Sequence, residues 1–286
     1  MEKLGIQTSS MLVELNISCW TARKLDRRVS EEVDANKATK ARAGNYNKNL
    51  LAGTNLLDSI VKYAANARAW HNNQTLPWSD KGTRLLPVVN FIAYKQQLNQ
   101  LESNYNRLVT SFLDAYPNLV SAAAFNLGDL FNREDYPEVD RVAGKFGFSY
   151  FFTPVPDAGD FRIDINNSIQ NELEQQFNSQ FERRVEGAMR DVWDRLHDVL
   201  LHMKDRLTDE EDGKRKNFHK TMLENANQLI EILPALNITK DAKLEDARKD
   251  LIKALQGLET DDLKDNPTTR LDVRTQVDEI LSKFDF

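Results

Sequence analysis

The sequence predicts a mainly α-helical protein. Apolar side chains recur every three or four residues over long stretches, which is the period of an amphipathic helix. Only 8 Pro and 11 Gly interrupt the 286 residues, and 41% of the residues are hydrophobic, which is enough for one large core or two modest ones. One segment departs from the helical period, and it predicts a small β-hairpin at about residues 145–165.

The N-terminal part mixes an extended segment with helices. Residues 11–20 alternate in part between polar and apolar side chains, which favours a short strand. Residues 21–43 carry apolar side chains spaced four apart, and residues 54–71 have one apolar face, so each stretch predicts a helix. A turn-rich connector follows at residues 75–82, where Pro77 favours extended backbone before it.

Three helices are predicted between this connector and the hairpin, and the third is a short one that starts at Asp135-Tyr136-Pro137. The first covers about residues 88–115 and ends at Tyr116-Pro117, because proline lacks a backbone donor and clashes with the preceding turn. The second covers residues 118–131 and is rich in small apolar side chains. Together with the hairpin, these elements predict a compact N-terminal module over residues 1–165.

The hairpin prediction depends on alternating aromatic residues. Phe146, Phe148, Tyr150 and Phe152 occupy every second position, which places four rings on one face of a strand. Residues 154–159 supply a Pro- and Gly-containing turn, and Phe161, Ile163 and Ile165 alternate on the return. This aromatic face is expected to be core, with a partner-docking edge as the alternative.

Residues 166–286 predict a C-terminal helical bundle or a coiled-coil arm. From about Asn167, apolar residues recur every three or four positions for about 40 residues. A helix of this length needs a partner for its stripe, either later helices near 214–232, 240–257 and 269–284, with Pro234 and Pro267 as stops, or a second subunit. The candidate packing or oligomer stripe consists of Leu173, Phe177, Phe181, Val185, Met189, Trp193, Leu196 and Leu200.

The net charge of −6 is unevenly distributed. Residues 1–165 carry 19 Lys and Arg against 18 Asp and Glu, whereas residues 166–286 carry 19 against 26. The acidic C-terminal half therefore argues against wrapping nucleic acid there. No apolar run approaches the roughly 20 residues of a membrane-spanning helix, and the N-terminus lacks the layout of a signal peptide. We therefore expect a cytoplasmic protein without membrane association.

Catalytic and cofactor motifs are absent from the sequence. It contains no phosphate-binding loop motif, no G-x-G-x-x-G, no G-x-S-x-G and no H-E-x-x-H, so we predict no cofactor, catalytic residue or metal ligand. The lone Cys19 is expected to be a small core residue. Carboxylates around Asp160 and Asp164 leave a metal-dependent enzyme as a third-ranked hypothesis, with strand ends as the simpler interpretation.

A basic stretch without acidic residues lies between Asp34 and Asp58. It reads as a loop, because it is small, polar and rich in Asn around Gly44. Cations beside an aromatic ring can grip phosphates or an acidic partner, although a solvated loop is the simpler interpretation. The candidate contact residues are Lys37, Lys40, Arg42, Tyr46 and Lys48.

Several short segments together resemble a known family. They are Leu15-Asn16-Ile17-Ser18 with Trp20 and Arg23-Lys24, the region of Lys48 and Leu50-Leu51, Thr75-Leu76-Pro77-Trp78 with Arg84-Leu85-Leu86-Pro87, Leu127-Gly128-Asp129-Leu130-Phe131 with Asp135-Tyr136-Pro137, and Pro154-Val155-Pro156 with Gly159-Asp160-Phe161-Arg162. Over about residues 10–165 the chain is similar to an uncharacterised family carried by tailed phages and integrative conjugative elements. The resemblance implies a bacterial host cytoplasm and gene neighbours that encode a MoxR- or cobalt-chelatase-like AAA+ ATPase and a von Willebrand A-like protein. It implies no defined activity.

Two hypotheses rank above an enzyme. The first is a non-enzymatic interaction protein of a phage or mobile element, which self-associates through its long helix and acts as an adaptor or scaffold for a partner such as the AAA+ ATPase, with counter-defence as one role. The second is a nucleic-acid-binding accessory in recombination or replication that uses the basic stretch.

Overall fold

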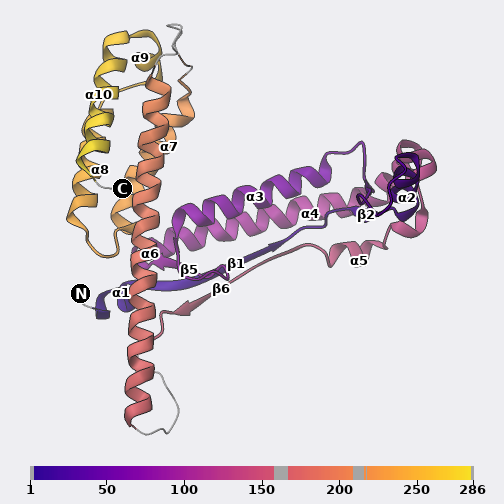
Figure 1. Cartoon of the computed structure of the whole chain (residues 1–286), viewed down its shortest axis with the longest axis horizontal. Helices are drawn as coiled ribbons and strands as arrows, with labels where there is room; N and C mark the ends of the chain where they lie inside the picture. Colours follow the sequence, from indigo (N-terminus) through magenta and orange to yellow (C-terminus); the bar gives the residue numbers. More distant parts are fainter. Residues whose placement is uncertain (1–2, 158–166, 209–215, 217, 285–286) are drawn as a thin grey trace. The chain divides into compact units, whose positions relative to one another are not determined.

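The computed structural model of the chain describes residues 3–157, 167–208, 216 and 218–284, and it confirms a mainly α-helical protein (Figure 1). Its contacts define two compact units. Unit 1 comprises residues 1–14, 72–94 and 151–286, and unit 2 comprises residues 15–71 and 95–150. This division differs from the predicted boundary at residue 165, because unit 1 contains segments from both sides of that position.

Unit 1 is built around one long helix. The predicted continuous helix after Asn167 is confirmed as α6, which spans Asn167–Leu207. The other helices of unit 1 are α1 (Lys3–Ser9), α7 (Lys220–Leu236), α8 (Ala242–Leu255), α9 (Thr260–Asp265) and α10 (Pro267–Lys283). No helix among the described residues combines the length and the apolar character that crossing a membrane requires.

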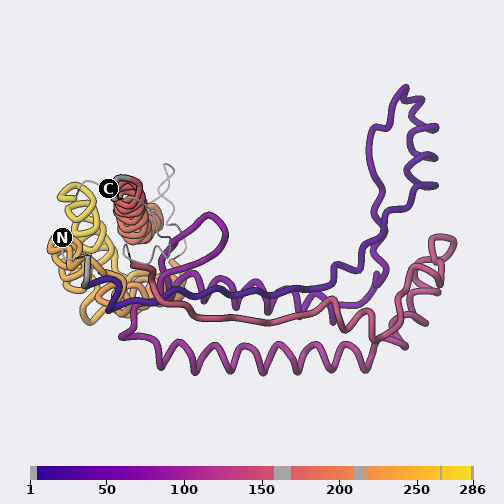
Figure 2. Tube along the Cα trace, turned by 90° about the horizontal axis from the view of Figure 1, so that it is seen from below, coloured from indigo at the N-terminus to yellow at the C-terminus, as the bar shows by residue number. Residues whose placement is uncertain are grey.

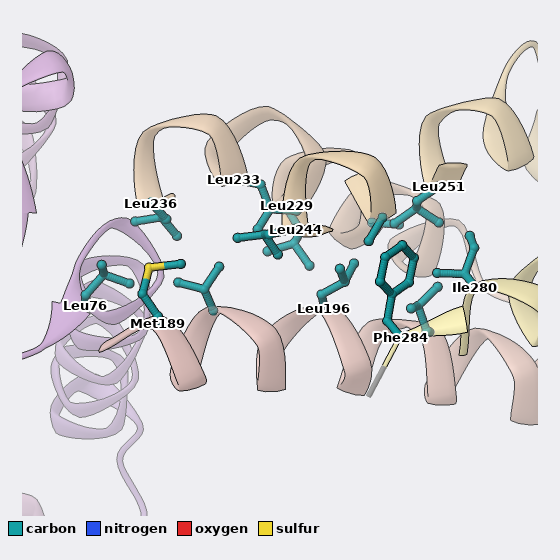
Figure 3. Packing of buried hydrophobic residues seen from close by; sticks show 14 of the residues in the cluster. Leu76, Met189, Leu196, Leu229, Leu233, Leu236, Leu244, Leu251, Ile280 and Phe284 are labelled. Carbon is teal, nitrogen blue, oxygen red and sulfur yellow. The ribbon is translucent and has the colours of Figure 1, made fainter. Parts of the chain in front are cut away.

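The apolar stripe of α6 packs against helices of the same chain. Met189 and Leu196 are directed toward Leu229 and Leu233 of α7 and Leu244 of α8 (Figure 3). From Phe181 onward the stripe belongs to the core of unit 1, together with residues of α10. Five stripe residues are buried, namely Phe181, Val185, Met189, Leu196 and Leu200, whereas Leu173, Phe177 and Trp193 are half-buried. The later helices thus supply the partner that the stripe requires.

Pro234 and Pro267, which were both predicted to lie between helices, have different positions in the structure. Pro234 was expected to end a helix, but it lies inside α7, two residues before that helix ends. Pro267 does start a helix, since it occupies the first turn of α10, where its missing N–H has no partner to lose. The side chain of Asn266 caps this helix by accepting from the N–H groups of Thr268 and Thr269 at 3.0 and 3.2 Å.

A buried arginine ties the carbonyl end of α6 to α9 and α10. Arg270 is only 4% exposed. Its guanidinium donates to the carbonyl oxygens of Leu207 at 3.2 Å, Leu263 at 3.1 Å and Lys216 at 3.1 Å. Helix ends leave carbonyl groups without intrahelical partners, so these bonds satisfy groups that would otherwise be buried unpaired.

A small antiparallel sheet accompanies the helices. Its strands are β1 (Ser10–Ser18), β4 (Leu76–Pro77), β5 (Arg84–Pro87) and β6 (Gly147–Pro154), in the order β4-β5-β1-β6. The strand expected at residues 11–20 is thus confirmed as β1, and the aromatic strand is confirmed as β6. The neighbour of β6 in the sheet is β1, and the predicted return at residues 161–165 lies outside the described residues.

Arginines from β5 and α6 hold the backbone that leads into β4. Arg195 of α6 donates to the carbonyl oxygens of Asn72, Asn73 and Thr75 at 3.0, 3.0 and 2.8 Å. Arg84 of β5 donates to the Thr75 hydroxyl at 2.7 Å and to its carbonyl at 3.0 Å. Because both guanidinium groups converge on residues 72–75, they fix the position of β4 and its following turn against α6.

Unit 2 contains two long helices and a short two-stranded sheet. Its helices are α2 (Arg27–Asn36), α3 (Leu56–Gln74), α4 (Phe91–Leu127) and α5 (Val139–Ala143). The last residues of α3 and the first residues of α4 belong to unit 1. The short sheet pairs β2 (Arg23–Leu25) with β3 (Asn47–Asn49). The helix expected over residues 54–71 is confirmed as α3. The stretch 21–43 is helical only within α2, because residues 23–25 form β2 instead.

The long helix α4 contradicts the predicted break at Pro117. The helix continues through that residue to Leu127, so the two helices expected over 88–115 and 118–131 are one. Interior proline costs a helix about 3 kcal/mol. Burial on both sides of it outweighs this cost, because Phe112, Tyr116 and Val120 lie one turn apart and are all in the core of unit 2.

Candidate functional site

A charged arm extends from unit 2. It consists of β2, α2, the segment that returns from α2, and β3, and we call residues 23–49 the α2 arm. In Figure 2 the helix and the returning segment, both indigo to purple, run beside each other away from the other helices of unit 2. The arm has little apolar core of its own, since the only buried residue of α2 is Ser30 and Val33 is 51% exposed.

Hydrogen bonds close the arm instead of apolar packing. Asp26 caps the start of α2, because its Oδ1 accepts from the N–H of Val29 at 3.2 Å. The Ser30 hydroxyl accepts from the N–H of Tyr46 at 2.9 Å, and the N–H of Asp26 donates to the carbonyl of Tyr46 at 2.9 Å. Near the tip, the Asp34 carboxylate accepts from the N–H of Ala43 at 3.2 Å. These bonds hold the returning segment against α2.

The base of the arm places two lysines opposite each other. Lys24 of β2 pairs in register with Lys48 of β3. Like charges directly across a strand pair destabilise a sheet. Asp135 removes this conflict by bridging them, since its Oδ1 lies 3.0 Å from Nζ of Lys24 and its Oδ2 lies 2.7 Å from Nζ of Lys48.

The Lys48 ammonium has a complete set of acceptors. Besides Asp135, it donates to the carbonyl oxygen of Leu130 at 2.8 Å and lies 3.4 Å from Oδ2 of Asp26. An ammonium has three N–H donors, so these three partners occupy all of them. The side chains of Lys48 and Asp135 are only 6% and 8% exposed. Lys48 was predicted as a surface contact in a loop, but it is a buried structural residue of β3.

The charged groups of this network have shifted pKa values. Burial by itself would lower the pKa of the Lys48 ammonium, but the carboxylates of Asp135 and Asp26 outweigh burial and raise it. Burial would likewise raise the pKa of the Asp135 carboxyl, but hydrogen bonds from Lys48 and Lys24 lower it. The backbone N–H of Val29 has the largest effect on the Asp26 carboxyl and lowers its pKa; burial opposes this shift, and the nearby Lys48 ammonium adds to it. All of these groups are therefore charged at neutral pH.

Other cations of the arm are exposed and have no carboxylate partner. Within the part of the chain that the structure describes, none of these side chains lies within 4.0 Å of an Asp or Glu oxygen; they are Arg23, Arg27, Lys37, Lys40 and Arg42. The ring of Tyr46 is 39% exposed beside them in the sequence. Residues 23–49 carry 8 Lys and Arg against 4 Asp and Glu, a net charge of +4. The arm thus presents an excess of unpaired positive charge to solvent.

An open pocket lies at the base of the arm. It has a volume of about 650 Å³ and is lined by Arg23, Lys24, Leu25, Asp26, Arg27, Lys48, Asn132 and Asp135. Sequence reasoning missed Arg23 and Arg27, which lie on β2 and α2 outside the predicted loop. Both line the same pocket as Lys48, and Arg23 pairs with Asn49, the residue next to Lys48 in β3. Their sequence signal is the dense run of cations at residues 23–28, which lies within the helix predicted over residues 21–43.

The remaining sequence candidates do not form a second site here. The α6 stripe is core from Phe181 onward. Asp160 and Asp164 lie outside the described residues. Among the residues that are described, no three His, Cys, Asp or Glu side chains gather in a way that suits a metal ion. Cys19 is half-buried, with its sulfur 3.6 Å from the Tyr105 hydroxyl.

Comparison of the chain with protein-family models, with curated proteins and with solved structures found no match.

Proposed function

We propose that this is a non-enzymatic binding protein whose α2 arm contacts the phosphate backbone of nucleic acid. The observation that carries the proposal is the set of five exposed cations without carboxylate partners on an arm that is closed by hydrogen bonds rather than by a core. Phosphate contacts need mobile, unpaired Lys and Arg side chains, because neutralising phosphates releases condensed counterions. Tyr46 offers an exposed ring on which an unpaired base can stack.

The charge distribution supports this assignment to unit 2. Unit 2 carries 15 Lys and Arg against 12 Asp and Glu, a net charge of +3, whereas unit 1 carries 23 against 32, a net charge of −9. The whole chain is acidic, so the protein's field does not attract nucleic acid in general. Binding at the arm is therefore expected to be local and sensitive to salt.

The test is fluorescence anisotropy of labelled single-stranded and double-stranded DNA with the full chain, from about 50 to 200 mM salt. The triple variant Lys37→Gln, Lys40→Gln and Arg42→Gln is expected to weaken binding by at least tenfold at the lower salt and to flatten the salt dependence. The matched control removes three exposed cations of unit 2 outside the arm, by Lys62→Gln, Arg107→Gln and Lys145→Gln. Absence of binding at about 50 mM salt, or equal losses in both triple variants, overturns the proposal.

A second candidate function is that of an adaptor for a partner protein. An exposed apolar patch in unit 1 favours it, because Val88, Val89 and Ile92 are 43%, 79% and 72% exposed within five residues. Exposed apolar clusters mark protein contacts more often than isolated residues do. The AAA+ ATPase that the family resemblance implies is the partner to test, and any self-association would use this patch in preference to the covered α6 stripe.

The adaptor function is tested by light scattering after size-exclusion chromatography, with and without that ATPase. A complex, or a mass that is a multiple of the 32.9 kDa chain, is expected to be lost in the double variant Val89→Asp and Ile92→Asp. Both residues are largely exposed, so the variant is expected to fold. A monomer that binds no ATPase removes this candidate and leaves the nucleic-acid function untouched.

A further inference from the structure

A groove in unit 1 combines unpaired arginines with an aromatic floor. It lies between the turn that follows β4 and the middle of α6, and its volume is about 500 Å³. The lining residues are Pro77, Trp78, Ser79, Asp80, Gln180, Arg183, Arg184 and Gly187. We call it the Trp78 groove. The bonds from Arg84 and Arg195 to residues 72–75 fix the turn on one side, and the core packing of α6 fixes the other.

Both arginines of the groove retain donors for a ligand. Arg183 and Arg184 are exposed, and among the described residues no carboxylate lies within 4.0 Å of either guanidinium. Arg183 makes only a long bond of 3.4 Å, from its Nε to the carbonyl of Ser179 in the same helix. The guanidinium of Arg184 lies over the Trp78 ring, 5.8 Å from its centroid.

Two buried donors in the wall of the groove lack acceptors. Trp78 is only 4% exposed, and its indole N–H has no hydrogen-bond partner within the described chain. The Ser79 hydroxyl is buried and unpartnered in the same way. Buried polar groups are nearly always paired, because an unpaired one has lost its water without replacement. The edge-to-face packing of Trp78 on Phe181, with ring centroids 5.4 Å apart, holds the indole in place.

The chemistry of the lining selects the ligand. Indole and guanidinium groups only donate hydrogen bonds, so the ligand must accept them. Arg183 and Arg184 together with the exposed Asp80 carboxylate give the groove a net charge of +1. That charge matches one carboxylate and disfavours a phosphate dianion, which Asp80 would repel. We propose that the Trp78 groove binds a carboxylate of an acidic polypeptide segment, with the arginine fork as its main contact.

The experiment follows the indole N–H signals of the isotope-labelled full chain by nuclear magnetic resonance. The chain has 4 Trp, and Trp78→Phe identifies the signal of Trp78 while it keeps a ring against Phe181. A capped peptide that contains one glutamate is titrated, with the matching glutamine peptide and pyrophosphate as separate arms. We expect the Trp78 signal to move downfield with the glutamate peptide and to stay in place in the other two arms. The reason is that the indole N–H, or the Arg184 guanidinium that lies over the ring, gains a hydrogen-bond acceptor.

Variants of α6 separate the groove from general charge. The double variant Arg183→Gln and Arg184→Gln is expected to weaken glutamate-peptide binding by at least tenfold, measured by calorimetry. Arg190→Gln removes an exposed cation from the same helix outside the groove and is expected to change affinity less than twofold. A Trp78 signal that stays still, an equal loss in Arg190→Gln, or binding of pyrophosphate in place of the peptide each overturns the proposal.

Discussion

Lys48 and Asp135 form an ion pair of 2.7 Å in which both side chains are more than nine-tenths buried. The two residues are far apart in the sequence, on β3 and in the turn before α5. Asp135 also bridges to Lys24 on the neighbouring strand. The pair therefore connects the base of the α2 arm to the segment that ends the long helix α4, and it fixes where the exposed cations of the arm begin.

Breaking this pair from one side should destabilise unit 2. Asp135→Asn leaves the buried Lys48 ammonium with a weaker set of acceptors and leaves Lys24 and Lys48 facing each other without a bridging charge. Removing one partner of a buried pair costs about 3–5 kcal/mol, so we expect a loss of about 3 kcal/mol in the free energy of unfolding, because Asp26 remains nearby. Denaturant unfolding measures it.

The double variant Asp135→Asn and Lys48→Met is the control for this prediction. It removes the buried charge together with its partner, so it should restore part of the stability that the single change loses. If the double variant lost more unfolding free energy than the two single variants lose together, the two side chains would not stabilise the fold through each other.

The pH dependence of the same pair can be stated with its sign. The pKa of Asp135 is lowered from 3.8 in the folded chain, so its contribution to stability is complete above that pH and is lost as the pH falls through the folded pKa. The pKa of Lys48 is raised from 10.5, so its contribution is complete below that pH and is lost as the pH rises through the folded value. The stability difference between the wild type and the double variant should thus be flat from about pH 5 to pH 9.

Denaturant unfolding of both proteins at several pH values measures this difference. A slope near pH 7 would contradict the assignment, since neither group titrates there.

Core positions of α6 provide a test of where its apolar stripe packs. Leu196→Ala should reduce the free energy of unfolding by about 2–5 kcal/mol, because Leu196 is fully buried in the core of unit 1. Leu173→Ala lies in the same stripe at a half-buried position and should cost less. Thermal or denaturant unfolding measures the stability, and light scattering measures the mass of each variant. If Leu196→Ala changed the mass of an assembly while leaving the unfolding of the chain intact, the stripe would be a contact between subunits.

The α6 stripe also shows what the sequence could predict about this fold. Its period of three to four residues identifies a helix and its buried face, because both follow from local geometry. What covers that face was open, since packing within one chain and packing between chains need the same pattern. Pro117 shows a position at which the local sequence rule predicts the wrong structure. A local rule ends the helix there, whereas the burial of Phe112, Tyr116 and Val120 in unit 2 sustains it.

The candidate site was predictable only where it is exposed. Lys37, Lys40 and Arg42 stand out as cations in a polar stretch without acids, and the structure leaves them exposed. Lys48 belongs to the same run of residues, but strand alternation turns it inward between two exposed asparagines. Its acid partners lie 22 and 87 residues away in the sequence, so no local pattern reveals them. Pairing between distant charges decides which basic residues remain available to a ligand.

Gly53 should be intolerant of a side chain for two separable reasons. Its φ is +89°, a left-handed conformation that costs residues other than glycine about 1–2 kcal/mol. An added Cβ would also lie 2.6 Å from Nδ2 of Asn126, the group that donates to the carbonyl of Ala52 at 3.0 Å. Gly53→Ala is therefore expected to destabilise unit 2 by about 2 kcal/mol or more, because backbone strain and the lost bond act together.

Gly82→Ala separates the two effects. Gly82 has a similar φ of +93°, but an added Cβ meets nothing within 4 Å, so only backbone strain applies. In denaturant unfolding, Gly53→Ala should lose more free energy than Gly82→Ala. Asn126→Ala should lower the free energy of unfolding less in the Gly53→Ala background than in the wild type, since the bond to Ala52 would already be broken. Equal losses at Gly53 and Gly82 would show that Asn126 moves aside without cost and that its bond does not tie the end of α4 to the loop before α3.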